Sequence, residues 1–258
     1  MHTTLSDKFI DLVNTMTKLR KECPWDQKQT FQSLRKYILE EAYEVVETID
    51  KENWKNLEEE LGDLLLQIIF QSVIGEESGD FSLESVIDTL NNKMVERHPH
   101  VFGSKKVESA EDVEKNWEHI KLVKEQRESL LDGIPKNAPA LLRAQRLQER
   151  AARVSFDWEN LPDVLDKVEE ELRELKIALN ENNPQNMEEE MGDLLFSLVN
   201  ISRFLEISAE DSLRKSNEKF SRRFNYIEES FDNNYVQMKK AGIRELEKKW
   251  EEAKKKEL

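Results

Sequence analysis

Residues 57–65 read LEEELGDLL and residues 187–195 read MEEEMGDLL, so one acidic motif occurs twice in the chain. A second pair of stretches, LEEAYE at 39–44 and EEELRE at 169–174, is separated by the same distance, because 187 − 57 and 169 − 39 both equal 130. Identical spacing inside two distant stretches indicates a tandem duplication of one module.

A third pair of stretches refines the domain division. KMVER at 93–97 returns as KFSRR at 219–223, an offset of 219 − 93 = 126, so the second copy has lost four residues, which we expect from its loop. The most linker-like run in the chain is DGIPKNAP, rich in Gly, Pro and Asn. We therefore predict an N-terminal module over 1–128, a linker over 129–139 and a C-terminal module over 140–258.

The composition favours helices. The 258 residues include only 7 Gly and 6 Pro, too few for a fold with many tight turns. Apolar residues recur three and four apart, the spacing of amphipathic helices, and no stretch alternates as a strand does. We predict an all-α protein whose first helix has apolar residues from Leu5 to Leu19 and ends at the Cys23-Pro24 step. Further helices are predicted over 30–50, 53–75, 82–97, 110–128, 140–153, 162–179, 184–205, 208–231 and 243–256.

Charge and cysteine content exclude several classes of protein. The net charge of −15 disfavours a nucleic-acid binder, which normally has a basic face. The single cysteine, Cys23, excludes an internal disulfide and a cysteine-based zinc site. The longest apolar stretch, 64–70, is much shorter than the ~20 residues of a membrane span, and residues 1–7 contain no apolar leader segment. We expect a cytoplasmic protein that does not bind membranes.

Acidic residues of the first copy converge in space. Glu41 and Glu44 lie three residues apart, as do Glu60 and Asp63, so each pair shares one helix face. The two helices are joined near residue 52 and form an antiparallel hairpin. The midpoints of 41 with 63 and of 44 with 60 are both 52, which predicts that all four carboxylates lie at one height.

The second copy repeats this arrangement around residue 182, with Glu171, Glu174, Glu190 and Asp193. Four converging negative charges repel one another unless cations intervene, and carboxylate oxygens suit Mg²⁺ or Mn²⁺. A helical-bundle di-iron site would need Glu-x-x-His pairs, and the sequence contains none. A solvated acidic face is the alternative interpretation.

Basic residues downstream of each acidic hairpin suit a phosphate ligand. Lys219, Arg222 and Arg223 have the spacing of one helix face in the second copy, and arginine binds phosphate oxygens in a bidentate manner. Lys93 and Arg97 form a weaker version in the first copy. Magnesium held by carboxylates usually keeps positions for substrate phosphates, so the two features together favour a phosphorylated substrate.

These motifs together resemble the MazG family. The motifs are CPWD at 23–26, RHPHVF at 97–102 and WEHIK at 117–121, then VSFDW at 154–158 and NEKFSRRF at 217–224, besides the acidic pairs. The resemblance covers nearly the whole chain. It implies an all-α homodimer, with each bundle completed across the subunit interface, that hydrolyses nucleoside triphosphates to monophosphates and pyrophosphate with Mg²⁺.

The resemblance also implies roles for individual residues of the C-terminal module, which the family uses as its main catalytic one. It makes Glu171, Glu174, Glu190 and Asp193 metal ligands, Lys219 and Arg223 triphosphate contacts, and Trp250 a base-stacking residue. Glu170 is our candidate for the general base. The first copy keeps all four carboxylates, so an active N-terminal site stays open.

Two other functions remain as alternatives. One is a non-catalytic helical interaction protein whose acidic patches bind cations or nothing. The other is a phosphohydrolase that attacks the γ-phosphorus; its P-loop version is excluded, because the sequence lacks Gly-x-x-x-x-Gly-Lys.

Overall fold

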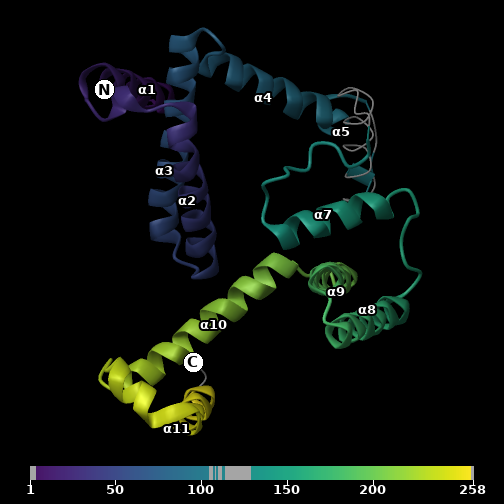
Figure 1. Cartoon of the computed structure of the whole chain (residues 1–258). Helices are drawn as coiled ribbons and strands as arrows, with labels where there is room; N and C mark the ends of the chain where they lie inside the picture. Colours follow the sequence, from purple (N-terminus) through teal and green to yellow (C-terminus); the bar gives the residue numbers. More distant parts are fainter. Residues whose placement is uncertain (1–3, 105–106, 108, 110–111, 114–128, 257–258) are drawn as a thin grey trace. The chain divides into compact units, whose positions relative to one another are not determined.

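The computed structural model describes residues 4–104, 107, 109, 112–113 and 129–256. All regular secondary structure in these ranges is helical, which confirms the predicted all-α class (Figure 1). The chain divides into two compact units, Met1–Lys121 and Leu122–Leu258. The helix predicted over 110–128 lies almost entirely outside the described residues, and the linker over 129–139 stays a prediction.

The first unit is built on a long antiparallel hairpin, α2 with α3 (Figure 1). Thr30 caps the start of α2, accepting a hydrogen bond from the backbone N–H of Ser33, and the helix ends at the predicted turn. α1 ends at Glu22, and Cys23 and Pro24 follow it. The helices of this unit are α1 (Leu5–Glu22), the short 3₁₀ helix η1 (Asp26–Lys28), α2 (Phe31–Asp50), α3 (Trp54–Ser78), α4 (Leu83–Arg97) and α5 (Pro99–Phe102).

The core of the first unit lies where α1 crosses the hairpin. Its buried apolar residues are Met16, Leu34, Ile69, Phe70, Val73 and Ile74. Trp25, from the loop after α1, packs beside this core, with ring centroids 6.1 Å from Tyr37 and 6.5 Å from Phe70. Aromatic packing therefore closes this end of the hairpin.

The second unit repeats the hairpin with α8 and α9. Asn182 ends α8 in the left-handed conformation (φ 54°), Asn183 caps α9, and Pro184 takes the first helical position, where proline is tolerated. The helices of this unit are α7 (Ala140–Ala152), α8 (Leu161–Glu181), α9 (Pro184–Phe204), α10 (Ala209–Glu229) and α11 (Tyr235–Lys255).

One predicted helix boundary and the predicted place of the four-residue deletion are wrong. α11 begins at Tyr235 rather than near residue 243, because Asn234 caps an additional helical segment before a break at Gly242 (φ 74°). The four residues absent from the second copy are missing from a helix rather than a loop. α3 has 25 residues and α9 has 21, whereas four residues follow each helix before the next one begins.

No helix in the described ranges is both long and apolar enough to cross a membrane.

Candidate metal centre and substrate pocket

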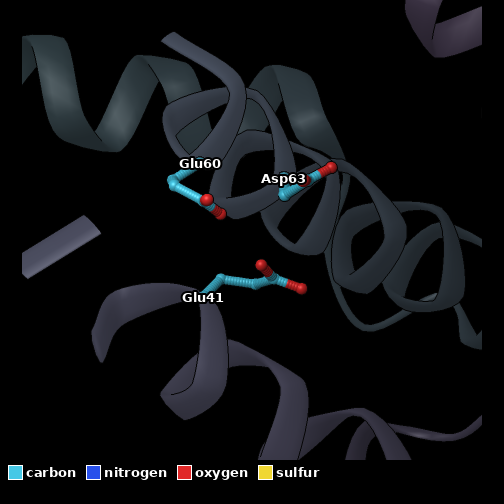
Figure 2. Close-up of side chains that lie close together, drawn as sticks. All are labelled: Glu41, Glu60 and Asp63. Atoms are coloured by element: carbon cyan, nitrogen blue, oxygen red, sulfur yellow. The ribbon is translucent and has the colours of Figure 1, made fainter. Parts of the chain in front are cut away.

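The hairpin of the first unit brings three of its four predicted carboxylates together. Glu41 projects from α2 toward Glu60 and Asp63 on α3 (Figure 2). One carboxylate oxygen from each residue lies within 4.8 Å of the others, and all three residues are half-buried. Glu44, the fourth predicted residue, is exposed and hydrogen-bonds with Glu41.

The electrostatics of this cluster disfavour its charged state. Burial raises the pKa of Glu41, and the hydrogen bond with Glu44 and the charge of Asp63 raise it further. Burial likewise raises the pKa of Glu60, with a further contribution from the charge of Glu44. A cation between these groups would relieve both effects.

The second hairpin forms the matching cluster from Glu171, Glu174 and Glu190, again with oxygens within 4.8 Å of one another. Glu171 is only 6% exposed, so an unpaired charge there would be costly. Burial raises the pKa of Glu190, followed by the charges of Glu174, Glu171 and Asp193. Asp193 therefore belongs to the electrostatic environment of this cluster.

Both clusters fit a divalent cation of the magnesium type. Their donors are all carboxylate oxygens, they come from facing helices, and their spacing allows one ion to contact several of them. The described residues of the two clusters include no histidine or cysteine, the donors that softer metals prefer.

Lys167 joins the second cluster, and the sequence analysis did not identify it. Its Nζ lies 2.7 Å from Glu171 Oε1 and 2.8 Å from Glu170 Oε1. Hydrogen bonds to these two carboxylates raise the pKa of Lys167. The spacing of Lys167 with residues three and four positions later is a recognisable helix ion-pair pattern, so this signal was present in the sequence. Glu170, the predicted general base, is thus ion-paired.

A pocket of about 640 Å³ adjoins the second cluster, with Glu171 and Asp193 among its lining residues. Its walls come from Leu131 before α7, from α7, from the loop after α7, and from α8 and α9. At one side, Arg203 donates hydrogen bonds to Asp157 (2.9 Å from Nη1) and Asn200 (2.8 Å from Nη2). The sequence analysis did not predict this pocket, because its residues come from five separate segments.

The predicted phosphate contacts lie on α10, whose far end packs against α11. The Arg223 guanidinium lies 5.6 Å from the Trp250 ring centroid, and the Phe220 ring lies 5.3 Å from it. Lys219 and Arg222 are exposed on the same helix. The structure thus brings Arg223 and Trp250 together.

Within one chain, these cations lie on a helix that leads away from the acidic cluster. Lys219 lies ten residues, about 15 Å, along α10, and α10 leads away from the α8–α9 hairpin (Figure 1). Lys93 and Arg97 have the same relation to the first cluster, because they lie on α4, which leads away from the α2–α3 hairpin (Figure 1).

The fold and the two clusters define a class of protein: a tandem all-α protein with a carboxylate cluster between paired helices in each module. The sequence profile of the MazG nucleotide pyrophosphohydrolase domain matches the chain twice, over residues 29–102 and 161–227. The chain belongs to this family, and the two matches confirm the predicted duplication.

Three relatives illustrate the similarity. The nucleoside triphosphate pyrophosphohydrolase/pyrophosphatase MazG of Thermotoga maritima is 45% identical over 95% of both chains. The nucleoside triphosphate pyrophosphohydrolase of Escherichia coli K12 is 38% identical over 98% of both. The uncharacterized protein YabN of Bacillus subtilis is 46% identical over 90% of this chain and 48% of its own length.

Proposed function

We propose that the chain hydrolyses nucleoside triphosphates to nucleoside monophosphates and pyrophosphate, with Mg²⁺ as its cofactor and Mn²⁺ as a substitute. The observation that carries this proposal is the carboxylate cluster of the α8–α9 hairpin, which adjoins a pocket of suitable size for a small molecule. The names of the relatives from T. maritima and E. coli point to the same substrates.

In this proposal the acidic cluster of the C-terminal module is the catalytic metal site. Glu171, Glu174, Glu190 and Asp193 hold the cation. When bound, Mg²⁺ would screen the triphosphate charge and lower the pKa of a coordinated water. A carboxylate accepts the proton of the attacking water, with Glu170 as our candidate for this base. Attack at the α-phosphorus breaks its bond to the bridging oxygen and releases pyrophosphate.

Lys167 gives this site a positive charge of its own. Its ammonium group contacts both Glu170 and Glu171, so it holds the candidate base beside the cluster. A triphosphate entering the site would compete for the same ammonium group and free Glu170 to accept a proton.

We further propose that the active site is shared between two subunits of a homodimer. Lys219, Arg222 and Arg223 lie on a helix that leads away from the carboxylates of its own chain (Figure 1). In a dimer, α10 and α11 of one subunit would bring these cations and Trp250 to the carboxylates of the other. The cations would then neutralise the leaving pyrophosphate, and Trp250 would cover the base.

Phosphorus NMR of the products tests the reaction. With Mg²⁺ and ATP, we expect AMP and pyrophosphate in equal amounts as the first products. ADP and orthophosphate would overturn the proposal in favour of γ-phosphorus attack. No turnover combined with no Mg²⁺-dependent thermal shift would favour the non-catalytic interaction protein.

Mixing two inactive variants tests the shared site. Glu174→Gln removes a carboxylate and Lys219→Ala removes a cation, so mixed dimers would contain one site with neither defect. We expect activity to return after the variants exchange subunits. No return of activity after demonstrated exchange, or an active monomer by light scattering, would overturn the shared site.

A further inference from the structure

Two helices of the second unit supply caps for each other's first turns. α7 begins after Pro139, which provides no side-chain cap, so the backbone N–H groups of its first turn need acceptors from elsewhere. Glu210, the second residue of α10, accepts a 3.4 Å hydrogen bond at Oε2 from the backbone N–H of Leu142 in that turn. A carboxylate at this place also suits the positive end of the α7 dipole.

A second bond runs in the opposite direction, from α10 to α7. Gln145 Oε1 accepts a 3.2 Å hydrogen bond from the backbone N–H of Ala209, the first residue of α10. Gln145 Nε2 donates to Glu149 Oε1 at 3.2 Å, so both ends of the amide are engaged and its orientation is fixed. Ala209 is only 8% exposed, and a buried N–H without an acceptor would be costly. We call the two bonds, Leu142 to Glu210 and Ala209 to Gln145, the α7–α10 tie.

The first unit caps the corresponding helices from within. Capping boxes formed by residues of their own first turns satisfy α1 and α4. Glu84 stands at the position of Glu210, because 210 − 84 is the same offset of 126 that relates the downstream basic stretches. Glu84 makes no hydrogen bond with any described residue. Among the described helices, the tie is therefore specific to the second unit.

The tie acts at the base of a long lever. Arg223 lies fourteen residues, about 21 Å, along α10 from Ala209. A swing of about 10° at the start of α10 would therefore move Arg223 by about 4 Å, which is more than the length of a hydrogen bond. α7 also lines the pocket beside the acidic cluster, through Leu147 and Ala151. The tie thus fixes the direction of α10 relative to the helices that form the pocket.

We propose that Gln145 and Glu210 are positioning residues for the substrate cations. By tying the start of α10 to α7, they hold Lys219 and Arg223 in the direction from which these cations reach a triphosphate in the other subunit. Without the tie, only a fraction of the molecules would present the cations correctly, and the apparent affinity for nucleotide would fall by that fraction. This inference rests on the shared nucleotide site proposed above.

Binding of a nucleotide that resists cleavage tests this role on the full chain. The probe is α,β-methylene-ATP with Mg²⁺, measured by calorimetry, because a methylene group replaces the oxygen at the bond that the reaction would break. Gln145→Leu and Glu210→Ala each remove one bond of the tie, and we expect each to weaken binding by ~5-fold. Glu210→Gln keeps an acceptor oxygen and should stay within ~2-fold of the wild type. Wild-type affinity in both Gln145→Leu and Glu210→Ala would overturn the proposal.

A background without the two cations separates positioning from a general loss of structure. In the Lys219→Ala/Arg223→Ala variant, α10 has lost the cations that the tie would position. Adding Gln145→Leu to this variant should therefore weaken binding by less than ~1.5-fold, which calorimetry at millimolar analogue can measure. The same ~5-fold loss in both backgrounds would show that the tie acts through the pocket or the fold, and would overturn the proposal.

Two controls separate the tie from helix capping in general. Ser208→Ala removes a cap that lies within α10 itself, because Ser208 Oγ accepts a hydrogen bond from the backbone N–H of Asp211. Glu84→Ala removes the counterpart of Glu210 in the first unit. Both controls should keep the wild-type affinity, although Ser208→Ala should lower Tm. A loss of affinity in Ser208→Ala as large as that in Gln145→Leu would overturn the proposal.

The same measurements separate this inference from the proposed reaction. Affinity that depends jointly on the tie and on the two cations supports the positioning role even if no pyrophosphate is ever released. Pyrophosphate release with equal losses of affinity in both backgrounds supports the reaction and overturns the positioning role. A wild-type chain that does not bind the analogue would overturn this inference.

Discussion

The two modules share a hairpin but use its interior differently. In α9, Asn200 and Arg203 line the pocket, and 130 positions earlier α3 has Phe70 and Val73, both buried in the core. The same backbone register therefore holds a polar wall in one copy and a packed core in the other.

A second position shows the same divergence beside the carboxylates. Lys167 pairs with Glu171 in α8, whereas 130 positions earlier Tyr37 packs against Trp25 in α2. The carboxylates themselves are the same in both copies. The modules therefore differ in the residues around the acidic cluster rather than in the cluster itself. This difference favours the proposal that the C-terminal module binds the substrate.

The largest expected difference concerns turnover. We expect Glu174→Gln or Asp193→Asn to reduce nucleoside triphosphate hydrolysis by ~100-fold or more, because even partners outside the ligand shell cost 10–100-fold in metal sites. Glu44→Gln or Asp63→Asn should leave much of the activity. A further reason is that Glu96 stands where the second copy has Arg222, a change of two charge units near a triphosphate.

Steady-state rates of all four variants at saturating Mg²⁺ provide the measurement. The reverse order of losses would reassign catalysis to the N-terminal module. Equal losses would indicate two working sites or sites coupled through a dimer. They would contradict the inferred difference between the two modules.

A smaller effect concerns the polar wall of the pocket. Arg203→Val gives α9 the residue that α3 has at this register, and it leaves the partly buried Asp157 carboxylate without its main partner. We expect a loss of about 2 kcal/mol in the free energy of unfolding, less than for a fully buried pair.

Urea denaturation of the single and double variants measures this coupling. Adding Asp157→Ala should cost less in the Arg203→Val background than in the wild type, because the unpaired charge is removed. Strictly additive losses would show that the two side chains stabilise the fold independently.

The smallest effect should be equal in the two modules. Burial and neighbouring charges raise the pKa of Glu60 and of Glu190, so folding disfavours the ionised form of each. At neutral pH, without divalent cations, Glu60→Gln and Glu190→Gln should each raise Tm slightly, and each should reduce the further increase that Mg²⁺ produces. Thermal unfolding with EDTA and with Mg²⁺ checks both changes. A lower Tm in EDTA would contradict the repulsion inferred for that cluster.

The sequence was sufficient to predict the hairpins and their acidic clusters. Helix periodicity, capping residues such as Thr30 and the symmetric positions of the carboxylates around residue 52 are local features, and local features can be read along the chain. The exposed positions of Glu44 and Asp193 were not predicted, because the midpoint rule fixes height on the hairpin but not the rotation of each helix.

The pocket and the first part of α11 could not be predicted in the same way. Gln148, Asp157 and Arg203 become neighbours only when three segments pack, and nothing in their spacing marks them as one site. The segment before Gly242 was missed because a glycine with a positive φ ended the apolar pattern that the prediction followed.

The shorter α9 has a consequence for the direction of the helix that follows it. Each helical residue turns the chain by about 100° and advances it by about 1.5 Å, so removing four residues shortens the helix by about 6 Å but rotates its end by only about 40° beyond a full turn. α10 therefore leaves its hairpin from nearly the same angular position as α4, but about one helical turn closer to the start of the preceding helix. Removing two residues instead would rotate the exit by about 200° and send α10 from the opposite side. The size of the deletion is thus one that changes helical length while nearly conserving helical phase.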